Sequence, residues 1–123
     1  MARQFAIAFG AVYVLTGILG FVLTSPILGL FGVNVLHNLV HLAVGGLWLA
    51  AAFGGILGAD SPRKASQLIG VVYLLVATLG FVLPDLMSQL LVINTADNFL
   101  HLGTAILALL IGFMTPRNAM VTA

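Results

Sequence analysis

Charge is scarce in this chain: charged residues make up 6% of its 123 residues, and cysteine is absent. The lack of cysteine excludes disulfides, thiolate nucleophiles, cysteine-ligated zinc and iron–sulfur clusters. Four basic residues cannot follow a nucleic-acid backbone, so we expect no nucleic-acid partner. The sequence also lacks a Ser/His/Asp triad, a carboxylate pair and a glycine-rich phosphate loop, so we expect that the protein is not an enzyme.

Apolar residues dominate the composition of the chain. They make up 62% of the chain, with a mean hydropathy of +1.23, and a soluble surface needs far more charge than remains. Four apolar segments cover about 5–23, 39–57, 65–83 and 99–114; the second and fourth reach spanning length when they are extended back to Asn34 and Asn94. Only helices satisfy their own backbone in lipid at this length. The predicted fold is therefore all-α, with four transmembrane helices in one integral membrane domain, 1–123.

The sequence repeats itself with an offset of 60 residues. Residues 10–53 align without a gap to residues 70–113, and 17 of the 44 aligned positions are identical. Apolar composition explains matched Leu and Val but not matched Tyr, Asn and His. We predict two tandem repeats, at about 3–58 and 63–117. With two passes each, the repeats run parallel around a pseudo-twofold axis along the membrane normal.

All lysines and arginines fall on one side of this topology: Arg3, Arg63, Lys64 and Arg117. The loops at 25–33 and 85–93 contain none. Since cytoplasmic loops carry the excess of Lys and Arg, both termini and the central loop are expected in the cytoplasm.

A stripe of polar residues opens the second and fourth segments. Its members are Asn34, His37, Asn38 and His41 in one copy and Asn94, Asp97, Asn98 and His101 in the other. The offsets of 0, 3, 4 and 7 lie on one face of a helix, and the stripe extends about 10 Å into the outer leaflet. Polar groups are costly in hydrocarbon, so the stripe is expected to face protein or a wet cavity.

The first turn of each stripe suits helix capping. Asn34 and Asn94 are typical N-caps, and the helix dipole favours a carboxylate such as Asp97 in the first turn. His37 stands where the other copy has Asp97. Either these two side chains pair across the axis, or His37 is solvated at the interface.

Capping leaves four residues of the stripe without a role: Asn38, His41, Asn98 and His101. One interpretation is a hydrogen-bond network that joins the second helix to the fourth. Another is ligation, in which His41 and His101 are metal ligands that bind haem iron or the magnesium of a chlorophyll-type pigment, with the asparagines orienting the ligand. A third is proton or ion handling, to which His37 and Asp97 would contribute.

Two smaller features accompany the stripe. Tyr13 and Tyr73 form a repeated pair, and a buried phenol normally finds a partner, so we expect a hydrogen bond between the repeats. The segment Leu86–Ile93 is predicted to lie as a short amphipathic element on the outer surface, matched by Ile27–Val33.

Several motifs resemble a known family: Ala2-Arg3-Gln4-Phe5, Gly-x-x-Tyr with Leu-Gly-Phe in the first and third helices, Asn-x-x-His-Leu in the second, and Ala96-Asp97-Asn98-Phe99-Leu100-His101-Leu102. The chain is similar to domain-of-unknown-function family 4383 from about Ala2 to Met114. That resemblance implies a small bacterial four-helix protein of the inner (cytoplasmic) membrane. It implies no catalytic residue and no ligand.

Three functions remain open from the sequence. The first is a non-catalytic accessory or scaffold subunit that self-associates or docks on a larger membrane complex. The second is a tetrapyrrole carrier that uses His41 and His101. The third is a small transporter or channel through the bundle.

Overall fold

The computed structural model describes residues 1–117, which form five α-helices and no β-strand. The helices are α1 (Ala2–Val22), α2 (Val35–Gly54), α3 (Ser61–Val82), α4 (Pro84–Leu91) and α5 (Thr95–Met114). The all-helical class predicted from composition is confirmed. Residues 118–123, the end of the expected domain, lie outside the described range.

Four of these helices, α1, α2, α3 and α5, are long and apolar enough to cross a membrane, with 20 to 22 residues each. At about 1.5 Å per residue they match the thickness of the hydrocarbon layer. α3 begins at Ser61, earlier than predicted, because Pro62 fits the first turn of a helix. α2 ends at Gly54, earlier than predicted, because Gly55 takes a left-handed conformation (φ 58°) that closes the helix.

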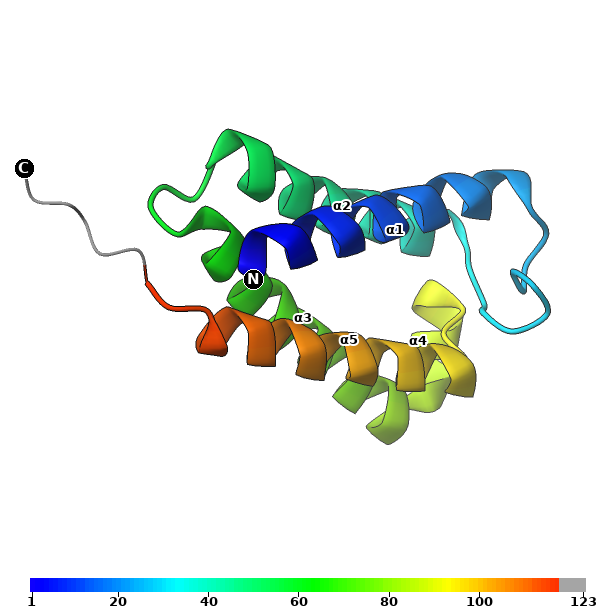
Figure 1. Ribbon diagram of the computed structural model, residues 1–123. Coiled ribbons are helices and arrows are strands. Elements are labelled where there is room, and N and C mark those ends of the chain that lie inside the picture. Colours follow the sequence, from blue (N-terminus) through cyan, green and yellow to red (C-terminus); the bar gives the residue numbers. More distant parts are fainter. Residues whose placement is uncertain (118–123) are drawn as a thin grey trace, which may run out of the picture.

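The four spans pack as two pairs. α1 packs along α2 and α3 along α5, and the pairs meet chiefly where α3 contacts α1 and α2. Figure 1 shows the two pairs, with α4 beside the second pair and with the N-terminus and the end of α5 at the same end of the bundle. We call that end, which carries Arg3, Arg63, Lys64 and Arg117, the basic end. The tandem-repeat relation of the pairs and its axis stay predictions from the sequence.

Close backbone approach holds the first pair together. A Cβ added at Gly45 of α2 would lie 2.7 Å from the carbonyl oxygen of Gly10 and 2.7 Å from the amide nitrogen of Val14, both in α1. In the second pair, a Cβ added at Gly70 would meet Leu109 at 2.7 Å. Lipid tails are as apolar as the helices, so packing of this kind, and not the hydrophobic effect, joins spans within a bilayer.

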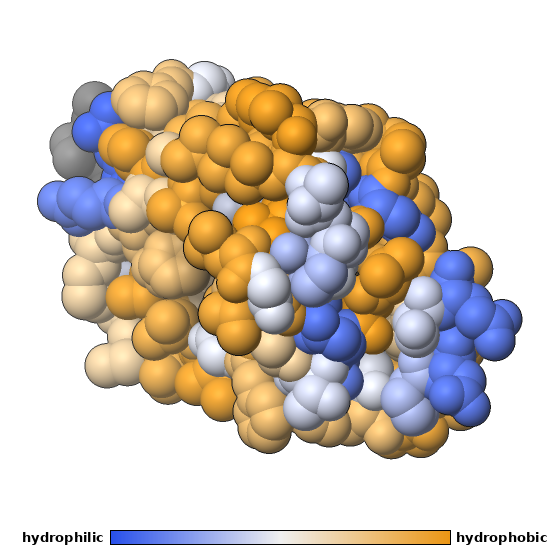
Figure 2. Space-filling model, turned by 90° about the vertical axis from the view of Figure 1, so that its right-hand side faces the viewer, coloured by the Kyte–Doolittle hydropathy of each residue, from blue (hydrophilic) through white to orange (hydrophobic). Residues whose placement is uncertain are grey.

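The interior combines small residues with a few large rings. Ala6, Ala65, Ala105 and Ala108 are fully buried and leave room for Trp48, whose Nε1 donates to Ser66 Oγ at 3.2 Å. The outward faces of the spans carry large apolar side chains, as lipid requires. Figure 2 looks onto the end that carries α4 and shows hydrophobic groups over most of it, with hydrophilic groups near the centre and at the left and right edges.

The expected amphipathic element on the surface forms in only one half of the chain. Residues 84–91 form the short helix α4, with Pro84 in its first turn and Asp85 following. The corresponding residues of the first half are not helical: Ile27 and Phe31 form an isolated bridge around Leu28 and Gly29, both at positive φ. The prediction of a match at 27–33 is therefore wrong, because Leu28 and Gly29 take left-handed backbone conformations that no helix contains.

Candidate functional site

The three histidines of the chain meet inside the bundle. His37 and His41 are four residues apart and share one face of α2, while His101 approaches from α5. Each is buried, with an exposed fraction of 2–4%. We call these three residues the histidine cluster.

The geometry of the histidine cluster is compact. Its ring centroids are 4.5 Å apart for His37–His41, 5.6 Å for His37–His101 and 6.3 Å for His41–His101. One ring nitrogen from each residue can be chosen so that all three lie within 4.8 Å of one another. Both nitrogens of His37 and of His41, and Nδ1 of His101, make no hydrogen bond of standard geometry to a described residue. Buried polar atoms are almost always satisfied, so ring nitrogens gathered in this way are candidates to hold a small ligand.

Two tyrosines border the cluster on the side of the basic end. The Tyr13 ring lies 5.1 Å from His41, the Tyr73 ring lies 5.2 Å from His101, and the two tyrosine rings are 5.4 Å apart. Tyr13 OH is hydrogen-bonded to Thr104 Oγ1 at 2.7 Å. Tyr73 OH is buried without a hydrogen bond of standard geometry to a described residue. The expected link between the halves is therefore made by Tyr13 and Thr104.

The asparagines at the start of each stripe cap their helices. Asn34 Oδ1 accepts from the His37 amide at 2.8 Å, and Asn94 Oδ1 accepts from the Asp97 amide at 3.0 Å. Their amide groups cross to the other half: Asn34 Nδ2 donates to Leu90 O and Asn94 Nδ2 to Leu30 O. Each cap therefore closes its own helix and fastens the connecting segment of the other half, which is α4 for Asn34 and the α1–α2 loop for Asn94.

Asp97 does not form a hydrogen bond with His37. Its Oδ2 accepts from the Asn94 amide at 2.9 Å, which completes a capping box, and from the Gly32 amide at 3.0 Å. His37 is 2% exposed, so it is not solvated at the interface either. The expectation of solvation is therefore wrong. His37 turns toward His41 and His101, and the expected pairing with Asp97 is met only as a through-space interaction of the Asp97 charge with His37.

The two deeper asparagines do not join α2 to α5. Asn38 packs over Gly20 of α1, and Asn98 packs over Gly80 of α3, so each works inside its own helix pair. No Cα atoms of α2 and α5 lie within 8 Å of one another. The expected network between these helices comprised Asn38, His41, Asn98 and His101. Its asparagine part is wrong, whereas His41 and His101 do meet between the helices, with ring centroids 6.3 Å apart.

A small cavity of about 30 Å³ adjoins the cluster and is lined by His37, His101, Tyr73 and neighbouring apolar residues of α2, α3 and the α4–α5 connection. Pockets for organic ligands measure ~300–1,000 Å³, so a haem or chlorophyll macrocycle does not fit beside these histidines. One water molecule does fit, since a water needs only ~10–15 Å³. The site therefore suits an ion with a small fourth ligand.

Sequence reasoning placed all three histidines among the candidate site residues but missed their grouping. His41 and His101 were matched by the repeat and considered as metal ligands, whereas His37 was considered only together with Asp97. The spacing of four between His37 and His41 is a usable signal, because such residues share a helix face. The repeat singled out Tyr73 together with Tyr13, whereas Thr104 gave no signal, since only the packing of the pairs brings it to Tyr13.

Comparison with known proteins gives a family and no function. No curated protein and no solved structure matched the chain. Residues 3–114 match the family described as a domain of unknown function, DUF4383, and this range covers all four spans and the histidine cluster. The chain therefore belongs to the DUF4383 family.

Proposed function

We propose that this protein binds one transition-metal ion inside the membrane through His37, His41 and His101, as a non-catalytic accessory subunit of a membrane complex. The observation that carries the proposal is the convergence of three buried imidazoles whose nitrogens lie within 4.8 Å of one another. Imidazole suits Zn²⁺, copper, iron and nickel. Zinc–nitrogen bonds are ~2.0–2.1 Å, so rotamer adjustments of about 1 Å bring the three nitrogens to one ion.

The surroundings of His37 support metal binding. A metal-bound histidine commonly directs its second ring nitrogen to a carboxylate or a carbonyl group. The backbone of Gly32 and Leu91 and the charge of Asp97 lie near the His37 ring. These groups would orient His37 and offset part of the charge of the ion, which matters where water is scarce.

The accessory role rests on the surface of the protein. The cavity beside the histidines admits nothing larger than a few water-sized groups, and the described loops are short. The outward faces of the spans are apolar over most of their length and are available to lipid and to neighbouring spans. We propose that partners are other membrane chains or a second copy of this chain.

The proposed location is a bacterial inner membrane with both termini in the cytoplasm. The supporting feature is the basic end, where Arg3, Arg63, Lys64 and Arg117 lie together. The histidine cluster, on this orientation, lies toward the outer side of the bilayer, below the α4–α5 connection.

Metal titration tests the proposal. The full chain is purified in detergent, stripped with a chelator and titrated with Zn²⁺, and bound zinc per chain is counted by elemental analysis after gel filtration. We expect one ion per chain. His101→Gln is expected to weaken binding at least about a hundredfold, since loss of even an outer-shell partner costs ~10–100-fold.

Thr104→Val is the matched control, because Thr104 is buried and polar near the cluster but contributes no ligand. It should bind zinc as the unaltered chain does. Helical circular dichroism verifies that each variant is folded. Zinc binding that is equal in the unaltered chain and in the triple His→Gln variant would contradict the proposal, as would failure of zinc, copper, iron and nickel alike to bind.

A further inference from the structure

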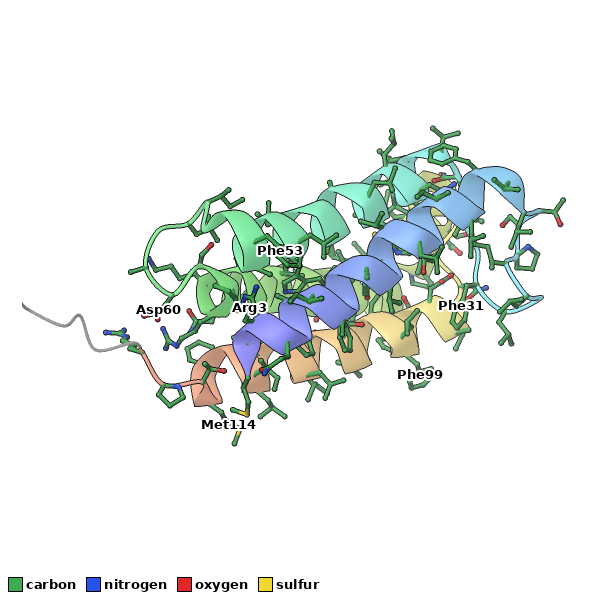
Figure 3. All side chains as sticks on the ribbon, turned by 45° about the horizontal axis from the view of Figure 1, so that its top comes forward. Arg3, Phe31, Phe53, Asp60, Phe99 and Met114 are labelled. Atoms are coloured by element: carbon green, nitrogen blue, oxygen red, sulfur yellow. The ribbon has the colours of Figure 1, made fainter. Side chains whose placement is uncertain are left out.

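A second cavity lies at the basic end, where the ends of the four spans come together. Its volume is about 450 Å³, and its wall includes Arg3 of α1, Phe53 of α2, Asp60, Arg63 of α3 and Thr115 after α5. Figure 3 labels Arg3, Phe53 and Asp60 in this part of the molecule. The volume falls in the ~300–1,000 Å³ range of small-molecule sites.

Two arginines hold equivalent positions around this cavity. Arg3 and Arg63 are sixty residues apart, and each lies in the first turn or turns of the first helix of its pair. Arg3 Nε donates to Ala52 O at 3.1 Å near the end of α2, and Arg63 Nε donates to Thr115 O at 3.0 Å after α5. Each guanidinium is therefore fixed by a bond to the carboxyl-terminal end of the partner helix.

Because the Nε atoms of both arginines are bonded to carbonyl groups, the Nη groups are left as donors for a ligand. With Nε committed to a carbonyl, the two Nη groups of each side chain are the donors that can reach a ligand in the cavity. Arg3 is further held over the Phe53 ring, with its guanidinium carbon 5.5 Å from the ring centroid. A planar guanidinium that is held in place binds carboxylate or phosphate oxygens in pairs, which a lysine does not do.

The charge and the depth of the cavity select the ligand. Arg3 and Arg63 outweigh Asp60, the one carboxylate in the described wall, so a group of single negative charge is favoured. Both arginines lie at the ends of helices of 21 and 22 residues, which is the depth of lipid headgroups. Phospholipid phosphates carry that charge at that depth.

We propose that the cavity at the basic end binds a phosphate group between Arg3 and Arg63, supplied by a membrane phospholipid. The same donors would accept the phosphate of a soluble ester, so the test includes both sources. The competing explanation is that these arginines only fix the orientation of the chain in the membrane. In that case only the charge of the two arginines is needed to orient the chain, and their position in the cavity has no role in binding a ligand.

Native mass spectrometry of the full chain in detergent tests this site. The chain is titrated separately with phosphatidylglycerol and with glycerol 3-phosphate. We expect saturable binding of the lipid at one site, reduced about tenfold by Arg3→Gln or Arg63→Gln, which is roughly the value of one charge-assisted hydrogen bond. Binding of glycerol 3-phosphate with the same dependence on the arginines would also support a phosphate site and identify a soluble ligand.

Arg117→Gln is the matched control, because Arg117 is exposed near the same end and does not line the cavity. It should leave binding unchanged. The double variant Arg3→Lys/Arg63→Lys keeps the charge but loses the paired donors, and it should bind several-fold more weakly while it retains helical circular dichroism. Equal losses in Arg117→Gln and Arg63→Gln, or unaltered binding by the folded double lysine variant, would overturn the proposal.

Discussion

In the first half of the chain Asn38 packs over Gly20, and sixty residues later Asn98 packs over Gly80 in the same way. The capping asparagines match too, since each donates to a backbone carbonyl of the other half, Leu90 of α4 or Leu30 of the α1–α2 loop. Matched residues thus assemble the two helix pairs and fasten them to each other. They supply the framework of the protein.

Where the halves differ, the histidine cluster appears. His37 stands opposite Asp97 in the alignment: Asp97 stays at the start of its helix as part of a capping box, and His37 joins His41 and His101. Thr104 stands opposite Val44, so Tyr13 has a threonine hydroxyl partner in the other half that Tyr73 lacks at the matching position. The comparison teaches that matched residues build the scaffold and supply two of the three histidines, and that the unmatched His37 completes the cluster.

The largest expected effect concerns the close approach of α1 and α2. Gly45 touches the α1 backbone, whereas the position sixty residues later already holds a buried alanine, Ala105. We predict that Gly45→Ala lowers the free energy of unfolding by about 1–3 kcal/mol, because the backbones must separate. Unfolding in SDS, followed by circular dichroism, measures this change.

Gly46→Ala is the control for that experiment. A Cβ added at Gly46 meets nothing within 4 Å, so this variant should unfold at the same SDS concentration as the unaltered chain. A slightly higher SDS concentration is also consistent, because alanine has a higher helix propensity than glycine. Equal destabilisation by Gly45→Ala and Gly46→Ala would show that close approach of Gly45 to the α1 backbone does not limit the stability of the protein.

A smaller difference is expected between the two helix caps. Asn94 belongs to a capping box with Asp97, whereas Asn34 caps α2 without an acidic partner. Asn94→Ala should lower the free energy of unfolding by about 1–2 kcal/mol, and Asn34→Ala by about 1 kcal/mol. The same SDS titration compares the two variants. A cost for Asn34→Ala equal to or above that for Asn94→Ala would contradict this ranking.

The smallest effect concerns the tyrosine hydroxyls. Thr104→Val should cost about 1 kcal/mol, because Tyr13 loses its partner, and the reverse change Val44→Thr should offer a partner to Tyr73. A double-mutant cycle of Tyr13→Phe with Thr104→Val isolates the bond, since the second change should cost nothing after the first. Strictly additive losses would show that the two hydroxyls do not stabilise each other.

The sequence predicted much of the fold because lipid imposes simple rules. Four spans of about the right length follow from hydropathy, and the caps at Asn34 and Asn94 follow from local chemistry. The sequence did not predict which helix each polar face packs against. A stripe such as Asn38 and Asn98 reveals a polar face but not the helix that it faces, which depends on distant glycines such as Gly20 and Gly80.

The same limit explains the incomplete prediction of the site. The repeat directed attention to matched residues, His41 and His101, and His37 was compared with Asp97 along the chain. Three-dimensional packing instead places His37 beside His101, with ring centroids 5.6 Å apart. The same alignment obscured the loop difference, where Leu28 and Gly29 take positive φ around an isolated bridge and the second half forms α4.

X-ray absorption at the zinc edge of the zinc-loaded chain tests the central claim most directly, because it reports the atoms bound to the metal. The account predicts three nitrogen neighbours at about 2.0–2.1 Å with the multiple-scattering pattern of imidazole, and loss of one of them in His37→Gln. A shell of oxygen atoms without imidazole scattering, or a shell that is unchanged in His37→Gln, would contradict it.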